Sequence, residues 1–136
     1  MDKLMLSLAG LPSFLLYFAL ALSLVAVFLF VYVRVTPYKE FTLIREGNTA
    51  AAVSLSGSLI GFILPLASAI THSVSPVDML IWGLIALVVQ ILAFFIACRL
   101  VPGIAEAIPQ GRTASATILA ALSLGAGILN AACMTY

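Results

Sequence analysis

The sequence predicts an all-α integral membrane protein with four transmembrane helices, arranged as two tandem two-helix repeats in parallel orientation. Of its 136 residues, 64% are hydrophobic and only 8% are charged, whereas soluble domains carry about 25% charged residues. Four apolar stretches are each long enough to cross a bilayer core of about 30 Å. Part of the first half also recurs in the second. We therefore expect one membrane domain over residues 1–136, with repeats at 11–70 and 77–136.

The repeat is clearest where each charged loop leads into a span rich in small residues. When the sequence is aligned with itself at a shift of 64 positions, several residues of the first half align with identical residues of the second half. These pairs include Ile44 with Ile108, Gly47 with Gly111, Thr49 with Thr113 and Ala50 with Ala114. Each repeat thus contains a bulky helix, a charged loop and a small-residue helix. Because each repeat has two spans, both copies should have the same orientation in the membrane.

The first span is expected over residues 11–33. Pro12 fits the first helical turn, where its missing N–H is harmless. Tyr17 and Tyr32 lie near the two ends of this bulky apolar run, as in an aromatic belt at the membrane interfaces. The long apolar core and the absence of a small-residue cleavage site favour a membrane anchor over a cleaved signal peptide.

The loop after the first span holds most of the charge. Arg34, Lys39, Glu40, Arg45 and Glu46 all lie within residues 34–48. Proline at position 37 and glycine at position 47 are typical first-turn and stop signals of a helix. They predict a short amphipathic helix over 37–46 at the membrane surface.

The second span, residues 49–70, is rich in small side chains. Twelve of its 22 residues are Gly, Ala, Ser or Thr, against five of 22 for residues 13–34. Gly57 and Gly61 form the G-x-x-x-G pattern that lets helix backbones approach closely in lipid. Pro65 removes a backbone donor, which predicts a kink or a free Gly61 carbonyl.

The third span, residues 77–98, is bulky and has Gln90 as its one mid-span polar group. Ser75 and Asp78 form a capping box at its start, so Asp78 is interpreted as an interfacial cap. Trp82 is interpreted as an interfacial anchor.

The fourth span, residues 113–134, again has a high content of small residues, 13 of 22. We predict helix packing at Ala121, Gly125 and Gly127, in addition to the two glycines of the second span. The second and fourth spans should form the inner pair of the bundle. The bulky first and third spans should face lipid.

The cations predict the orientation. Five of the six Lys and Arg residues lie in the first and third loops, and Lys3 lies on the opposite side. By the positive-inside rule those two loops are cytoplasmic, and both termini are periplasmic or external. Small faces on more than one side of the inner helices also favour a homo-oligomer within the lipid bilayer.

Enzymatic chemistry is not expected. The chain has one histidine, no mid-span carboxylate, no catalytic triad, no phosphate-binding glycine loop and no metal-ligand cluster. We therefore predict no catalytic residues, no metal and no cofactor. Cys98 and Cys133 are interpreted as small buried hydrophobic residues, and we expect them at opposite membrane faces, which argues against a disulfide between them. The formal net charge of +1 gives no basic field for nucleic acid.

Two sets of residues remain as candidate sites. Gln90 and Asn130, with Pro65, could line a polar path, although interhelical hydrogen bonds are the simpler explanation of two mid-span amides. The corners, where a charged loop turns into the following span, could instead bind a cytoplasmic protein. Alternatively, they are simple turns that end the loop and start the helix. The corner residues are Arg45, Glu46, Gly47, Asn48, Gly111 and Arg112.

The runs at residues 36–40, 44–51 and 64–70 resemble the YjfL-like bacterial inner-membrane family, catalogued as domain of unknown function 350. Residues 78–83 and 129–136 are similar to that family too. The resemblance implies a duplicated two-helix unit in the bacterial cytoplasmic membrane. It also implies an association with envelope stress or ATP-grasp-type partners, and a channel has been suggested. It brings no established activity and no catalytic residues.

Two functional hypotheses follow. In the first, an oligomeric, non-enzymatic module supports a pore or solute path between the second and fourth spans. In the second, a non-conducting accessory subunit recruits a cytoplasmic partner through its charged loops.

Overall fold

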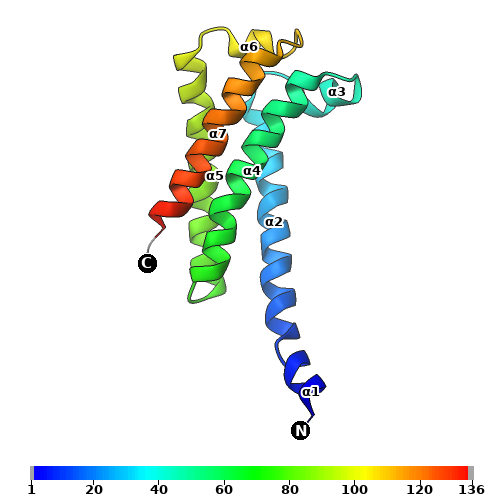
Figure 1. The fold of residues 1–136 in the computed structure, drawn as a ribbon, viewed down its shortest axis with the longest axis vertical. Helices are drawn as coiled ribbons and strands as arrows, with labels where there is room; N and C mark the ends of the chain where they lie inside the picture. The colour runs from blue at the N-terminus through cyan, green and yellow to red at the C-terminus, as the bar shows by residue number, and fades with distance from the viewer. Residues whose placement is uncertain (1, 135–136) are drawn as a thin grey trace.

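The computed structural model describes residues 2–134 and is all-helical in that range. Helix α1 (Lys3–Leu8) leads into the long α2 (Leu11–Val35), and the short α3 (Glu40–Arg45) precedes α4 (Thr49–His72). Helix α5 (Pro76–Leu100), the short α6 (Ile104–Ala107) and α7 (Thr113–Cys133) complete the chain. Figure 1 shows α2, α4, α5 and α7 side by side, with α3 and α6 together at one end.

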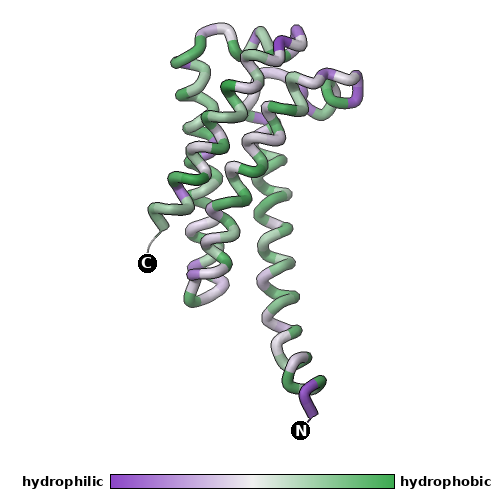
Figure 2. The backbone as a smooth tube through the Cα atoms, viewed as in Figure 1, coloured by the Kyte–Doolittle hydropathy of each residue, from purple (hydrophilic) through white to green (hydrophobic). Residues whose placement is uncertain are grey.

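Within residues 2–134, four helices are long and apolar enough to span a membrane: α1 with α2 taken together, α4, α5 and α7. This confirms the all-helical membrane class and the four spans. Figure 2 shows hydrophobic residues along all four spans, and hydrophilic residues mainly near α3, near α6, at the α4–α5 turn and at the start of α1. The polar ends of the bundle therefore mark its two membrane interfaces.

The ends of the helices follow from their capping residues. Ser75 caps α5 by accepting a 3.1 Å hydrogen bond from the Asp78 backbone N–H, and the Asp78 carboxylate accepts one from the Val74 backbone N–H at 3.2 Å. Ser75 therefore caps α5 as predicted, but the Asp78 carboxylate bonds to Val74 and not to the Ser75 N–H that a strict capping box uses. At the N-terminus of α4, the Asn48 side chain accepts from the Ala51 N–H at 3.0 Å. Helix α4 then continues through Pro65 to His72.

Three expectations are wrong in detail. The surface helix is shorter than residues 37–46, because residues 36–38 form a bend, Lys39 is extended and α3 begins only at Glu40. Tyr32 is fully buried inside the bundle and does not lie at the membrane interface, because its hydroxyl forms a hydrogen bond with Ser58 there. The second and fourth spans, which were predicted to form the inner pair, are also not equally buried. Over an 18-residue stretch of each helix, half of α4 is buried, against 22% of α7 and 28% of α5, so α4 is the most buried of these three helices.

Candidate functional site: the polar centre of the helix bundle

Helices α4 and α7 pack backbone to backbone at three glycines. A Cβ added to Gly57 would lie 2.5 Å from the Ala120 Cα, and one added to Gly127 would lie 2.6 Å from the Gly61 Cα. At Gly61 the added Cβ would overlap the backbone carbonyl of Ser123. Three of the five predicted packing residues, Gly57, Gly61 and Gly127, therefore form one interhelical contact.

The other two packing candidates lie off this contact. Nothing approaches within 4 Å of a Cβ added to Gly125, and Ala121 is exposed on the outer side of α7. They lie on a second small face of α7, which this chain does not cover.

The four spans meet at a buried cluster of polar groups beside the glycine contact. The Ser58 hydroxyl of α4 lies 2.8 Å from the Tyr32 hydroxyl of α2 and 3.2 Å from the Ser123 hydroxyl of α7. The Gln90 side chain of α5 donates a 2.9 Å hydrogen bond from Nε2 to the Ser123 carbonyl oxygen. All four residues are buried. We call Tyr32, Ser58, Gln90 and Ser123 the polar junction.

Only one of the three residues predicted to line a polar path, Gln90, lies in the junction. The Gln90 amide nitrogen lies 2.7 Å from the position of a Cβ on Gly61, one helical turn from Pro65. Asn130 does not join the junction by any hydrogen bond among the described residues. The Asn130 Nδ2 and the Gln90 Oε1 atoms are both buried without a partner in residues 2–134.

Aromatic side chains enclose the junction on the α2 side. The Phe28 and Phe62 rings are stacked with centroids 4.6 Å apart, and the Tyr32 and Phe94 rings meet edge to face at 5.9 Å. These rings exclude water and lipid from the Tyr32 hydroxyl, which strengthens its hydrogen bond to Ser58.

A buried carboxyl lies beside this core, at the end of the bundle that carries α3. Glu40 is only 1% exposed, and its two carboxylate oxygens each lie 2.8 Å from the Thr36 hydroxyl. The described residues show no ion pair to it. Burial raises the pKa of Glu40, and the Thr36 hydrogen bond only partly opposes this. Burial likewise raises the pKa of the neighbouring Tyr38 hydroxyl, which has no hydrogen-bond partner in residues 2–134.

The two predicted corners are joined to each other. Gly47 and Gly111 have positive φ angles of 86° and 78°, a conformation that favours glycine. The Asn48 side chain donates from Nδ2 to the Ile108 carbonyl oxygen at 3.0 Å. It thus bridges the first corner to the end of the α6 segment.

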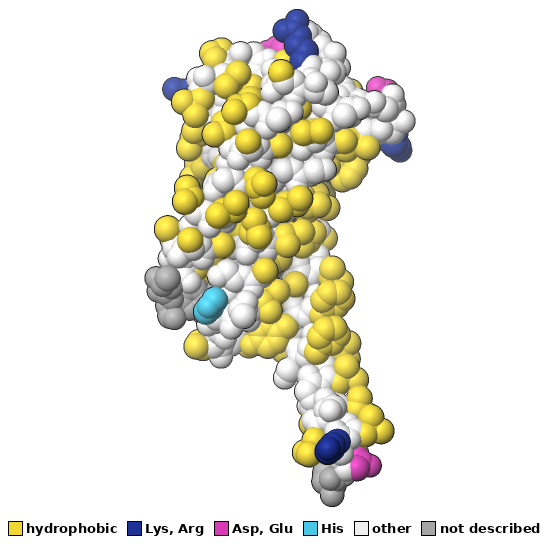
Figure 3. All heavy atoms as spheres, in the orientation of Figure 1, with side chains coloured by type: hydrophobic (Ala, Val, Ile, Leu, Met, Phe, Trp, Pro, Cys, Tyr) yellow, Lys and Arg dark blue, Asp and Glu magenta, His cyan; other side chains and the backbone are white. Residues whose placement is uncertain are grey.

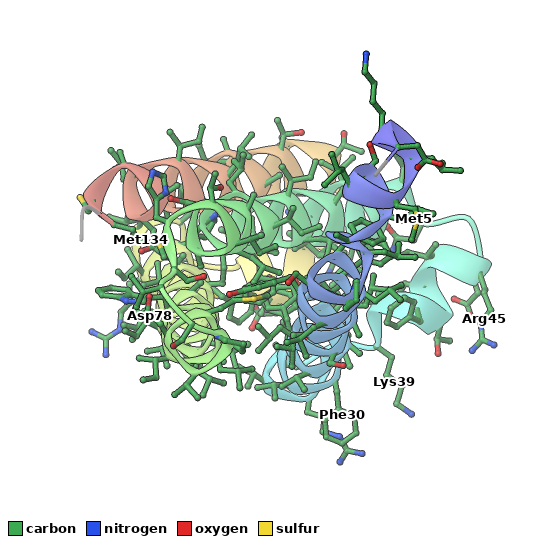
Figure 4. All side chains as sticks on the ribbon, turned by 90° about the horizontal axis from the view of Figure 1, so that it is seen from below. Met5, Phe30, Lys39, Arg45, Asp78 and Met134 are labelled. Atoms are coloured by element: carbon green, nitrogen blue, oxygen red, sulfur yellow. The ribbon has the colours of Figure 1, made fainter. Side chains whose placement is uncertain are left out.

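A groove of about 390 Å³ lies between the corners and is lined by Glu46, Gly47, Asn48, Gly111 and neighbouring residues. Arg45 and Arg112 are exposed at its two sides. Figure 4 shows the Arg45 and Lys39 side chains pointing away from the bundle. Glu46 is the one charged residue that lines the groove, and Arg45 and Arg112 are its exposed cationic neighbours in the sequence.

Sequence reasoning missed four of the important polar residues: Tyr32, Ser58, Ser123 and Glu40. Ser58 and Ser123 are hidden among many small residues of similar spacing. Glu40 is one of five charged residues in its loop. The one available signal was the four-residue spacing of Thr36 and Glu40 directly after an apolar span.

No group of three or more His, Cys, Asp or Glu side chains suited to a metal ion occurs among the described residues. Cys98 and Cys133 are free thiols, and only Cys98 is partly buried, whereas Cys133 is exposed.

The fold and the composition thus define a small multi-pass membrane protein with a hydrogen-bonded centre. Residues 5–134 match the family described as Domain of Unknown Function (DUF350), and this chain belongs to that family.

Named relatives support the same assignment. The chain is 41% identical over 129 residues to the "UPF0719 inner membrane protein YjfL" of Escherichia coli K12, covering 95% of this chain and 98% of the relative. It is 30% identical over 86 residues to the "UPF0719 transmembrane protein YshE" of Bacillus subtilis 168, covering 63% and 64%. No solved structure matches the chain. These similarities, with the four apolar helices, identify a multi-pass inner-membrane protein.

Proposed function

We propose that this chain is a non-enzymatic, self-associating membrane platform that holds a cytoplasmic protein partner at the groove between its two corners. In this proposal the two halves are tandem repeats in parallel orientation. The loops carrying α3 and α6 face the cytoplasm, and both termini face the opposite side.

The distribution of cations supports this orientation. Arg34, Lys39 and Arg45 lie between α2 and α4, and Arg99 and Arg112 lie between α5 and α7. Figure 3 shows basic side chains at the upper end of the molecule and a further one at its lower tip. Short loops rich in Lys and Arg remain cytoplasmic.

The main observation in support of the platform is the groove between the two corners, which a hydrogen bond joins to each other. Asn48 caps α4 and at the same time bonds to the Ile108 carbonyl, so the two corners form one fixed surface. A surface that is fixed before binding loses little conformational entropy when a partner docks. The exposed Arg45 and Arg112 side chains at the rim suit a partner with acidic residues.

A photo-crosslinking amino acid at Gln110, which lines the groove, tests this proposal in cells. We expect one discrete crosslinked protein that is lost on Gly111→Val and on the Arg45→Ala, Arg112→Ala double variant. Leu92 is exposed on a span, so the same probe there is the matched control and should crosslink lipid only. A pattern at Gln110 unchanged by these substitutions would contradict the proposal.

A solute path is the second candidate, favoured by the unpartnered amide atoms of Gln90 and Asn130. Such a path requires α4 and α7 to separate, because Gly61 and Gly127 are in backbone contact. Conductance of purified protein in liposomes, altered by Asn130→Leu, would favour the path. A stable oligomer that conducts nothing would favour the platform.

A further inference from the structure

Glu40, the first residue of α3, is the only charged side chain that is buried among residues 2–134. An ionised carboxylate can accept about four hydrogen bonds. Here the Thr36 hydroxyl has one proton to share between two carboxylate oxygens, each 2.8 Å away. The only other donor that favours the ionised form is the backbone N–H of Glu40 itself. The ionised form is therefore poorly satisfied at this position.

The cations near Glu40 in the sequence and the fold are directed elsewhere. The Arg34 guanidinium carbon lies over an aromatic ring of its own helix, 4.2 Å from the ring centroid. Lys39 and Arg45 point away from the bundle (Figure 4), and Arg99 of α5 is exposed. No cation within residues 2–134 thus compensates a negative charge on Glu40.

The titratable groups that do face Glu40 are acids. Tyr38 in the same loop and Tyr32 of α2 interact electrostatically with Glu40, and both also interact with Cys98 of α5. Helix α4, against which α3 packs, has His72 as its one ionisable side chain, at its last position. All of the facing groups are neutral or negative, so the site accommodates Glu40 in its protonated form.

Helix α3 is the element that could carry an ionised Glu40 to water. Residues 36–38 form a bend before α3, and Gly47 follows it with a positive φ of 86°. Glu40 is the one fully buried residue of this six-residue helix, and Leu43 and Ile44 pack against the core with partly buried side chains. A charge on Glu40 therefore opposes the docking of a short helix that has a turn at each end.

The same helix forms part of the corner groove. Leu43 lines the groove together with Glu46, and the Leu43 carbonyl accepts a 2.9 Å hydrogen bond from the Asn48 backbone N–H. The Asn48 side chain in turn donates to the Ile108 carbonyl. Movement of α3 away from the bundle would displace one wall of the groove and pull on the residue that joins the two corners.

We propose that Glu40 is a proton-binding site that controls the corner groove. With the proton bound, α3 is docked and the groove is formed; without it, α3 leaves the bundle and the groove loses one wall. The inference rests on the proposed function, because it names the regulation of the groove that holds the partner.

The direction of the pH dependence follows from the burial. Burial holds the pKa of Glu40 in the docked state above its ordinary value of 4.5, a value close to that of the undocked, solvated side chain. Docking is therefore strongest below about pH 4.5 and weakens as the pH rises through the raised pKa. The partner should bind in acid and be released as the cytoplasm becomes more alkaline.

The accessibility of α3 to a water-soluble maleimide in the full chain tests the proton-binding site. In a Cys98→Ala, Cys133→Ala background, Ile44→Cys places a thiol on the packed side of α3, and Phe41→Cys places one on its exposed side. We expect the ratio of the two labelling rates, Ile44→Cys to Phe41→Cys, to rise several-fold with pH. Because one proton is released, the rise should not exceed about tenfold per pH unit.

Two variants check that Glu40 causes this rise. Glu40→Gln keeps a neutral side chain and should make the ratio independent of pH. Thr36→Val removes a hydrogen bond that favours the ionised form, so the ratio should level off at a higher pH than in the unmodified loop. A ratio that does not change with pH, or that rises equally in Glu40→Gln, would overturn the inference.

The crosslink from a photoreactive residue at Gln110 separates this inference from the proposed function. The unmodified chain should lose the crosslink in the pH range in which Ile44→Cys becomes accessible, and Glu40→Gln should keep it. If α3 responds to pH and the crosslink does not, or if Glu40→Gln loses the crosslink as well, control of the groove is overturned and the platform stands. If no crosslink forms at any pH while the labelling still depends on Glu40, the platform fails and the proton-dependent docking of α3 stands.

Discussion

Gly127 of α7 lies directly against the backbone of Gly61 in α4, at the point where Pro65 leaves the Gly61 carbonyl without its helical donor. A Cβ on Gly127 would overlap that carbonyl oxygen. Proline at position 65 removes the N–H that would otherwise bond to the Gly61 carbonyl. Because residue 127 is glycine, its Cα can approach the free Gly61 carbonyl oxygen closely. Such a C–H···O contact is weak but favourable in lipid.

Gly127→Ala should destabilise the protein because the added methyl group has no room between the two backbones. Overpacking of this kind costs about 1–3 kcal/mol. Gly125→Ala is the matched control, since a Cβ there meets nothing within 4 Å. Thermal unfolding in one detergent should show a lower Tm for Gly127→Ala and an unchanged or slightly raised Tm for Gly125→Ala. Equal Tm values for the two variants would contradict the close contact.

The polar junction should contribute modestly to stability. Tyr32→Phe keeps the ring packing against Phe94 and removes only the hydroxyl that lies 2.8 Å from Ser58. Interhelical hydrogen bonds in membranes contribute about 0.6 kcal/mol on average and at most about 1.7 kcal/mol. We expect Tyr32→Phe and Gln90→Leu each to lower the free energy of unfolding by an amount in this range, as measured by unfolding in mixed micelles.

Asn130→Leu provides the control for the junction. The Asn130 Nδ2 atom makes no hydrogen bond within residues 2–134, so removal of the amide should leave protomer stability unchanged or raise it. A decrease in stability as large as that caused by Gln90→Leu would show that Asn130 has a hydrogen-bond partner outside the protomer, such as a residue of a second copy.

The four spans themselves were predictable from the sequence. The second span, predicted over residues 49–70, is observed at Thr49–His72, and the third, predicted over 77–98, is observed at Pro76–Leu100. A long apolar segment predicts a helix here, because backbone N–H and C=O groups must be hydrogen-bonded within the segment when they lie in lipid. The Ser75 cap then defines where α5 begins.

The packing partners and the relative heights of the spans were not predictable. Helix α7 has small residues on two faces, and nothing in the sequence distinguishes Gly127, which packs on Gly61, from Gly125, which packs on nothing in this chain. Helix α2 is apolar on every side, so no periodicity shows that Phe28 is level with Phe62. In lipid, apolar patterning does not drive helices together, and the register depends on close contacts that only the folded chain reveals.

Glu40 should make the stability of the protein dependent on pH. Its pKa is raised by burial above the ordinary value of 4.5, so the folded state binds a proton that the unfolded state releases more readily. The protonated form therefore stabilises the fold fully below about pH 4.5. This contribution is lost as the pH rises through the raised pKa.

Glu40→Gln imitates the protonated side chain and should remove this pH dependence. We expect the variant to be more stable than the unmodified protein at neutral pH and similar to it in acid. Glu46→Gln, at an exposed position in the same loop, is the control and should leave the pH profile unchanged. A profile of Tm against pH that is identical for Glu40→Gln and the unmodified protein would contradict the buried-carboxyl interpretation.

The two corners should respond unequally to substitution although they occupy equivalent places in the repeat. Asn48 caps α4 and also donates to the Ile108 carbonyl, whereas Arg112 begins α7 without any side-chain capping bond. Loss of an N-cap costs about 1 kcal/mol, and loss of a second hydrogen bond adds about 1 kcal/mol.

Asn48→Ala should therefore lower the free energy of unfolding by about 1–2 kcal/mol, and Arg112→Ala should change it by less than about 0.5 kcal/mol. Hydrogen exchange at the first turn of α4 localises the effect, because Ala51 loses the acceptor of its backbone N–H. In the platform proposal, Asn48→Ala should also weaken the crosslink at Gln110, because the groove wall that contains Ile108 and Pro109 is no longer fixed to the first corner. A crosslink that survives Asn48→Ala unchanged would mean that the partner recognises the rim charges alone.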